Sequence, residues 1–319
     1  MLKNQNPGRT IIVSMNFILK SLGVLFILLT LFAYTKKEDI VSAYKNLTTL
    51  KQVITTVPLE AQYTLGGEVI SMDQFDLRER MERELLINAY HHATTIQHIK
   101  LANRYFPTIE KILKENNIPE DFKYLAVAES SLRNSTSSAG AKGIWQFMSN
   151  TFKEMNYEIS DDVDERYHLE KSTQAACDYL NRLYKRFGSW VSVAAAYNTG
   201  PTSYAKYLKE QNAENYFDVN VSDETMRYPF RILAIKTIME NPEKFGYHIP
   251  EEDKYRPLDD YQLIEVDSTI ANLADFAKGE GISYRTLKIY NPWLRSSTLK
   301  VNKDARYELK VPVLESESK

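Results

Sequence analysis

The sequence predicts a mainly α-helical protein that ends in a small βααβ unit. Between residues 76 and 245 apolar side chains recur at spacings of three and four, and the alternation typical of half-buried strands is almost absent. The composition changes at Pro250 and Pro257, and residues 261–313 have the pattern strand, helix, helix, strand. Because a chain of 319 residues is long enough for about two domains, we expect a helical domain at 76–250 and a small domain at 258–314.

The residues before the helical domain are interpreted from their charge and polarity. Basic side chains precede an apolar stretch at 22–32, and two lysines follow it. Such a start is typical of a signal peptide, and the stretch is short for a membrane-spanning helix. We expect a signal peptide or an N-terminal membrane anchor at 1–35, with cleavage and retention both open, and therefore a periplasmic protein of the cell envelope, free or attached to the membrane. The polar, mixed residues 36–75 predict a linker or loosely packed arm.

Periodicity and helix-end signals place the elements of the helical domain. A helical pattern runs from Phe75 to about Asn117, and we expect a break near Pro107. Pro119 begins another helix, whose first turn carries acidic residues that the helix dipole favours. A loop rich in small residues follows at 133–143. The remaining helices are expected at 145–155, 170–187, 189–197, 201–210 and 223–240.

Composition excludes several classes of function. The formal net charge of -2 and the pI near 6.3 give no reason to expect nucleic acid as a partner. The single cysteine, Cys177, excludes an internal disulfide, and its apolar helical surroundings predict a buried side chain. The histidines have no carboxylate at ligand spacing, so we expect no metal and no organic cofactor.

Glu129 is the candidate catalytic residue. It follows four apolar residues, Leu125 to Ala128, near the end of a helix. A carboxylic acid that such neighbours desolvate keeps its proton to higher pH, as a general acid requires. Taken alone, the same run fits an ordinary exposed glutamate better.

Four sequence blocks, which follow one another in order, favour the catalytic interpretation of Glu129 over an exposed glutamate. They are Glu129-Ser130, then Ser137 ahead of GAKGIWQFM, then DERYHLEKSTQAACDYLNRLY, and finally AAAYNTG at 194–200. Over residues 118–208 the chain resembles the Slt-type lytic transglycosylases, and among them the membrane-bound lytic murein transglycosylase D group. The resemblance implies a goose-lysozyme-like helical fold and an enzyme of cell-wall turnover that acts on peptidoglycan glycan strands. Trp145, where many relatives have methionine, and Pro229 depart from the pattern.

The resemblance also assigns roles to residues. Glu129 is implied to be the only acid and base: it protonates the glycosidic oxygen between N-acetylmuramic acid (MurNAc) and N-acetylglucosamine (GlcNAc), and then deprotonates the MurNAc C6 hydroxyl. That hydroxyl closes onto C1 to give a 1,6-anhydroMurNAc end, so no water is consumed. The implied substrate-binding residues are Ser130, Ser137, Gly143, Gln146, Tyr197, Asn198, Glu224 and Tyr228.

Two other functions remain open from the sequence. A hydrolytic muramidase on the same fold would need a second carboxylate to activate water, and residues 158–165 contain several. We expect these acids instead to cap a turn and a helix start. A catalytically silent glycan-binding scaffold is the other alternative, although a scaffold would have no need of Glu129.

Aromatic residues and the C-terminal unit bear on glycan binding. Trp145 and Phe147 could stack on sugar rings, whereas helical spacing places Trp190 in the core. The stretch DSTIANLADFAKGEGISYRTLKIYNPWL resembles a LysM-type module, although EVDST lacks the usual glycine-aspartate turn. The resemblance implies binding to GlcNAc chains, which would tether the enzyme to an insoluble polymer. The alternative is a domain that only packs against the helical domain.

Overall fold

The structure is a computed structural model that describes residues 20, 22–34, 36, 37, 54–303 and 305–313. The chain from Thr56 onward forms one compact unit, and the residues before it form another. Residues 22–34 form a helix with exposed apolar side chains. Within the described ranges, no helix is both long enough and apolar enough to cross a bilayer. Residues 1–19, 21 and 35 of the predicted signal peptide or anchor lie outside the described residues.

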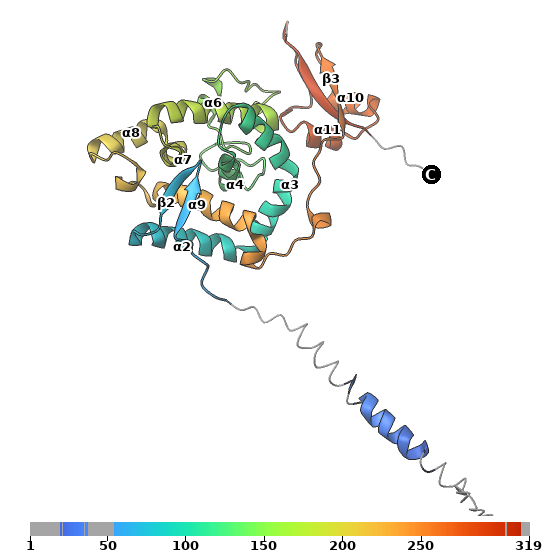
Figure 1. Cartoon of the computed structure of the whole chain (residues 1–319). Helices are drawn as coiled ribbons and strands as arrows, with labels where there is room; N and C mark the ends of the chain where they lie inside the picture. Colours follow the sequence, from blue (N-terminus) through green and yellow to red (C-terminus); the bar gives the residue numbers. More distant parts are fainter. Residues whose placement is uncertain (1–19, 21, 35, 38–53, 304, 314–319) are drawn as a thin grey trace, which may run out of the picture. The chain divides into compact units, whose positions relative to one another are not determined.

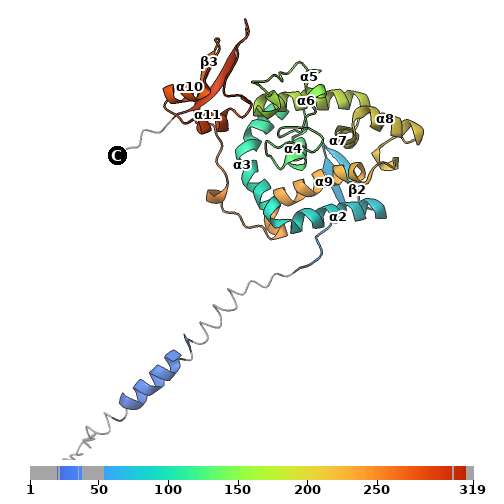
Figure 2. The same ribbon diagram turned by 180° about the vertical axis from the view of Figure 1, so that it is seen from behind.

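The helical domain surrounds one short central helix, α4 (Lys123–Ser130). In Figures 1 and 2, α4 lies inside a ring made by other helices of the domain. Leu125, Ala126 and Val127 of α4 are at most 1% exposed, and the long helices α3 and α9 pack against α4. The other helices are α2 (Phe75–Tyr90), α3 (His92–Glu115), α5 (Ser149–Lys153), α6 (Leu169–Phe187), α7 (Trp190–Thr199), α8 (Pro201–Glu210) and α9 (Asp223–Glu240).

The prediction of a loose arm at 36–75 was wrong for its second half. Residues 62–71 form an antiparallel hairpin of β1 (Gln62–Leu65) and β2 (Glu68–Ser71). Leu65 and Ile70 are buried in the main core. Gly66 and Gly67 make the turn with φ of 60° and 83°, the left-handed backbone that a two-residue hairpin turn requires. The strands are too short for their alternation to stand out in the sequence.

Two prolines lie inside helices, and one of them contradicts the prediction. The predicted break near Pro107 was wrong, since α3 continues through it and the chain breaks at His91 instead. Pro229 lies inside α9, where it has no N–H for the carbonyl of Thr225. The hydroxyl of Tyr216 donates mainly to the carbonyl of Met226 and lies 3.4 Å from that of Thr225, so it partly replaces the missing donor. Pro229 therefore does not disrupt α9.

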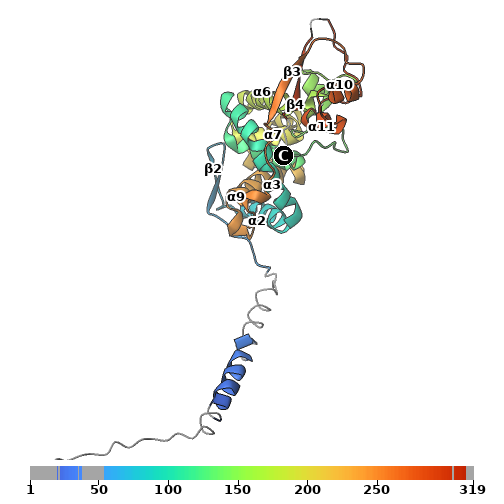
Figure 3. The ribbon, with the colours of Figure 1, turned by 90° about the vertical axis from the view of Figure 1, so that its right-hand side faces the viewer.

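The predicted βααβ unit is confirmed. Its elements are β3 (Tyr261–Val266), α10 (Leu273–Gly279), α11 (Tyr284–Tyr290) and β4 (Tyr307–Pro312). β3 and β4 pair antiparallel, with Tyr261 opposite Pro312 (Figure 3). The prolines before the unit do not mark a free linker, because the backbone N–H of Tyr255 donates to Lys100 of α3 at 3.1 Å. The side chain of Arg104 in α3 also donates to the carbonyl of Arg256 at 2.9 Å.

The hairpin also caps the helix α7. The carboxylate of Glu68 accepts the backbone N–H of Trp190 and, at 2.7 Å, the hydroxyl of Ser189. Ser189 is the N-cap residue of α7, so the acid lies at the positive end of the helix dipole. A segment far away in the sequence thus stabilises the start of the helix that carries Tyr197.

We expect Glu68→Ala to lower the free energy of unfolding by about 1–2 kcal/mol, because it removes a cap and a favourable charge at a helix N-terminus. Urea denaturation at neutral pH measures the change. The control is Glu79→Ala, an exposed position on α2 that should change stability by less than about 0.5 kcal/mol. Equal unfolding midpoints for the two variants would contradict the capping role.

Candidate active site

Glu129 lies in the last turn of α4, where the buried helix meets the surface. Ser131 and Leu132 follow with φ of 54° and 57°, and this left-handed backbone ends the helix. The side chain of Glu129 is half-buried. Burial raises its pKa from an ordinary value of 4.5 to about 7, because the charged form loses solvation. The sequence-based expectation of a desolvated carboxyl at this position is confirmed.

Helix α9 supplies the groups that tune this carboxyl. The hydroxyl of Tyr228 donates to Oε1 of Glu129, which lowers the pKa of Glu129 and opposes the effect of burial. The positive charge of Arg231 lowers this pKa as well, whereas the negative charge of Glu224 raises it. Residues 224, 228 and 231 are spaced by four and three, so they lie on one face of α9. Tyr228 is almost fully buried, whereas Glu224 is exposed.

Arg231 and the acid that holds it were not predicted from the sequence. Glu84 of α2 is 1% exposed and lies 2.6 Å from Arg227 and 3.6 Å from Arg231. A buried carboxylate needs such cationic partners, so this cluster also fixes the arginines of α9. The spacing of Arg231 from Tyr228 could have indicated it, because residues three apart share a helix face.

Tyr197 and Asn198 at the end of α7 connect the site to neighbouring segments. The hydroxyl of Tyr197 donates to the carbonyl of Trp145 at 2.7 Å. Burial and the charge of Glu129 raise the pKa of Tyr197 well above its usual value. The side-chain oxygen of Asn198 accepts the hydroxyl of Thr225 at 2.8 Å and thereby links α7 to α9. Both residues therefore brace the surroundings of Glu129.

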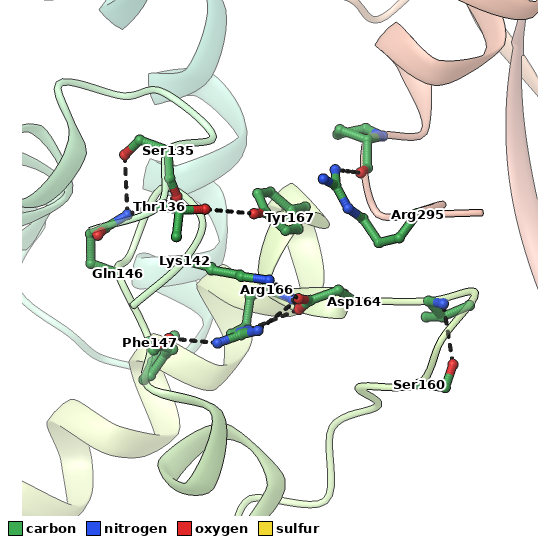
Figure 4. A network of polar contacts seen from close by, with 12 residues as sticks. Ser135, Thr136, Lys142, Gln146, Phe147, Ser160, Asp164, Arg166, Tyr167 and Arg295 are labelled. Carbon is green, nitrogen blue, oxygen red and sulfur yellow. Dashed lines mark hydrogen bonds and ion pairs between the residues drawn. The ribbon is translucent and has the colours of Figure 1, made fainter. Parts of the chain in front are cut away.

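Gln146 and Gly143 shape the loop of residues 133–147, which we call the active-site loop. The side-chain amide of Gln146 donates to the carbonyl of Gly143 at 2.7 Å and to that of Ser135 at 3.2 Å. Figure 4 shows Gln146 beside Ser135. Gly143 has a φ of 83°, and a Cβ there would lie 1.9 Å from the carbonyl oxygen of Arg166. Position 143 therefore requires a glycine because the loop passes very close to the backbone of Arg166.

The two serines expected to bind substrate differ in their surroundings. Ser130 is 9% exposed, and its hydroxyl lies 2.7 Å from the carbonyl of Ile144 and 3.2 Å from that of Ala126. It therefore ties α4 to the active-site loop, and its role as a substrate-binding residue stays a prediction. Ser137 is half-buried in a tight turn, where its Oγ accepts the N–H of Ala141 at 3.0 Å.

The aromatic residues of the loop are core residues. Trp145 is fully buried, and its indole N–H donates to Thr173 at 3.0 Å. Phe147 is only 3% exposed, so neither side chain presents a face to a sugar ring. Trp190 is buried as expected and stacks on Tyr184 with ring centroids 4.2 Å apart.

The buried acidic residues at 158–165 are held by structural partners, whereas Asp161 is exposed. Asp164 pairs with Arg166 at 2.7 Å, and its carboxylate also accepts the N–H of Arg166 at 3.3 Å. Glu165 pairs with Lys171 and accepts the N–H of Glu158 at 2.8 Å. Asp162 accepts the N–H of Lys300 at 3.0 Å. The expectation that these acids cap turns is confirmed for Asp164, the N-cap of a short 3-10 helix.

Comparison with known families agrees with this architecture. Residues 106–220 match the transglycosylase SLT domain, and residues 262–315 match the soluble lytic transglycosylase C-terminal LysM-like domain. The chain therefore carries an SLT transglycosylase domain followed by a LysM-like domain, and the resemblance noted in its motifs is confirmed.

Among curated proteins, the chain is similar to membrane-bound lytic murein transglycosylase D of Escherichia coli (strain K12). The two are 30% identical over 229 residues, which cover 70% of this chain and 49% of the relative. The chain thus spans about half the length of the curated relatives it matches first.

Two solved structures are also similar in part. An inactive variant of the lytic transglycosylase Slt from Pseudomonas aeruginosa aligns with a TM-score of 0.36 at 18% identity, over 48% of this chain and 26% of the other. The 70 kDa soluble lytic transglycosylase from Escherichia coli aligns with a TM-score of 0.39 at 16% identity, over 55% and 33%.

The raised pKa of Glu129 predicts how Glu129→Gln affects stability. Because the folded-state pKa of about 7 exceeds the ordinary value of 4.5, the wild-type free energy of unfolding loses a contribution as pH rises between these values. Glutamine carries no charge, so the variant should be more stable than the wild type at pH 8 by about 2–3 kcal/mol and show little of this gain at pH 4. Urea denaturation across pH measures the difference. Glu79→Gln is the control, and a pH-independent difference for Glu129→Gln would contradict the assignment.

Tyr228→Phe should raise the pKa of Glu129 above about 7, because it removes a hydrogen bond that stabilises the carboxylate. Carboxyl-carbon NMR titration of the folded protein measures it, with Glu129→Gln identifying the signal. Tyr124→Phe is the matched control. Tyr124 lies on α4 with Glu129, but its hydroxyl donates to Glu240 and not to Glu129. A titration midpoint that stays unchanged in Tyr228→Phe would show that the hydroxyl does not act on Glu129.

Proposed function

We propose that the protein is a peptidoglycan lytic transglycosylase that cleaves the MurNAc–GlcNAc bond without water, with Glu129 as general acid and base. One observation carries the proposal: the SLT domain holds a half-buried carboxyl whose pKa is raised to about 7. A group with a pKa near the working pH is present in both protonation states, so it can give a proton in one step and take one in the next.

The proposed reaction has two proton transfers. Protonated Glu129 gives its proton to the glycosidic oxygen as the bond from MurNAc C1 to that oxygen breaks. The acetamido group of MurNAc stabilises the positive charge that develops at C1. The Glu129 carboxylate then takes the proton of the C6 hydroxyl, whose oxygen bonds to C1. Glu129 ends protonated, the products are a GlcNAc 4-hydroxyl and a 1,6-anhydroMurNAc end, and no water is consumed.

Tyr228 has a clear part in this scheme. Its hydroxyl donates to Oε1 of Glu129, which leaves Oε2 as the oxygen that can exchange a proton with substrate. The same hydrogen bond orients the carboxyl and stabilises it after the first transfer. Tyr197 and Gln146 act indirectly, because their side chains donate to backbone carbonyls of the active-site loop and hold it in place.

The acidic residues at 158–165 argue for a lyase over a hydrolase. A water-activating carboxylate must be free to accept a proton, whereas Asp164 and Glu165 are buried in ion pairs. Glu224 is the acid whose charge reaches Glu129, and it is exposed. Glu224 is therefore the acid that we would test first as the base of a hydrolytic rival.

The proposed place of action is the cell envelope. Peptidoglycan lies there, and the curated relative is named as a membrane-bound murein transglycosylase. The apolar stretch at 22–32 with basic residues before it agrees with export to the periplasm or attachment to the membrane.

Glu129→Gln should abolish release of anhydromuropeptides, a loss of at least roughly 10²–10⁴-fold, because the amide can neither give nor take the proton. Purified protein is incubated with sacculi, and the products are analysed by mass spectrometry, since reducing ends carry one more water than anhydro ends. Glu224→Gln is the matched control and should still give anhydro ends. Reducing ends from the wild type that disappear in Glu224→Gln would identify a hydrolase instead.

A further inference from the structure

The LysM-like module is fastened to residues 158–170 of the helical domain, which we call the connecting segment. Val163 forms a β-bridge with Leu294 of the module. On either side of this bridge, the N–H of Asp164 donates to Trp293 at 2.9 Å, and the N–H of Arg295 donates to Asp162 at 2.7 Å. The contact is therefore made by the backbone of both domains.

Side chains strengthen the same junction. The buried carboxylate of Asp162 accepts the hydroxyl of Thr298 at 3.1 Å and the N–H of Lys300 at 3.0 Å. The guanidinium of Arg295 lies 4.3 Å from the ring centroid of Tyr167, and the ring of Trp293 stacks on His168. Val163 and Tyr167 belong to the hydrophobic core of the module, at 1% and 4% exposed.

The connecting segment holds the active-site loop from its other side. The guanidinium of Arg166 donates to the carbonyl of Phe147 at 3.2 Å, and the carbonyl of Arg166 fills the space beside Gly143. The hydroxyl of Tyr167 lies 3.2 Å from that of Thr136. Figure 4 shows these contacts together: Arg295, Tyr167 and Thr136 follow one another from the module to the loop.

The active-site loop in turn adjoins the catalytic carboxyl. Its residue Ile144 accepts the hydroxyl of Ser130, the residue after Glu129. Its residue Trp145 accepts the hydroxyl of Tyr197. Contacts of about 3 Å thus run without interruption from the module, through Asp162 to Tyr167, to the loop beside Glu129.

We infer that the LysM-like module is a brace that holds the active-site loop in its productive shape, with Asp162 and Tyr167 as positioning residues. The inference rests on the proposed transglycosylase function. It adds that the module raises the rate of this reaction by holding the active-site loop. A separable tether would leave Val163 and Tyr167 free to face solvent when it moved. Both are instead core residues of the module, so the module cannot leave without exposing them.

The two roles of the module differ in the substrate they affect. A tether matters for insoluble sacculi and leaves turnover of a short soluble glycan fragment unchanged. A brace matters for both, because the loop lies at the reacting bond. Asp162→Ala in the full-length protein should therefore lower kcat/KM on the soluble fragment by about three- to thirtyfold. A loss confined to sacculi, or no loss at all, would overturn the brace.

Tyr167→Phe keeps the ring in the module core and removes only the hydroxyl that contacts Thr136, so this variant should fold even if Asp162→Ala does not. We expect a three- to tenfold lower kcat/KM on the soluble fragment. Thr136→Val should lower kcat/KM by the same factor, whereas Thr136→Ser keeps the hydroxyl and should have the wild-type kcat/KM. The Tyr167→Phe/Thr136→Val double variant should have a kcat/KM no lower than that of either single variant. Fully multiplicative losses would show that the two hydroxyls do not act together.

Hydrogen–deuterium exchange separates this proposal from the proposed function. Residues 133–147 should exchange faster in Tyr167→Phe and Asp162→Ala, while α2 and α9 stay protected as in the wild type. Glu265→Gln, in an exposed ion pair with Arg306 on the module, is the control and should change nothing. Unchanged loop exchange in both variants overturns the brace even if the wild type makes anhydro products. If the wild-type protein makes no anhydro products, the proposed function is wrong, whereas the exchange result still tests whether the module holds the loop.

Discussion

The burial of α4 is the constraint on which the rest of the structure depends. A carboxyl at the end of a buried helix loses solvation, and this loss raises the pKa of Glu129 to about 7. The helices packed around α4 create that environment, and α9 adds the hydroxyl of Tyr228, which keeps the charged form accessible. Burial and hydrogen bond oppose each other, and the balance gives a group suited to both directions of proton transfer.

Local patterns predicted much of this arrangement. Periodicity gave the long helices and the βααβ order of the module, whereas the apolar run before Glu129 pointed to a desolvated acid only together with the four motif blocks. These features depend on residues close together in the chain, so a single sequence carries them. The positions of Tyr197 and Tyr228 near Glu129 came from the family resemblance, since no local signal joins residues as far apart as Glu129 and Tyr228.

Long-range partners explain what the sequence could not predict. Pro229 is accommodated because the hydroxyl of Tyr216 partly replaces its missing donor, and nothing near Pro229 announces that partner. The hairpin at 62–71 is packed because its apolar residues meet helices from later in the chain. The family resemblance implied that Ser130 binds substrate, but no local signal showed that its hydroxyl donates to a carbonyl fourteen residues further on.

The acidic connecting segment joins the LysM-like module to the active-site loop. Asp162 bonds to the module, while Asp164 fixes Arg166, which bonds to the active-site loop. Carboxylates committed in this way are poor bases, because protonation would break the ion pairs and hydrogen bonds that hold them. The contacts of Asp162 with the module and of Asp164 with Arg166 therefore also remove these two acids as rivals to Glu129. A transglycosylase needs that outcome, since a second free carboxylate beside the bond would activate water and release the reducing end instead.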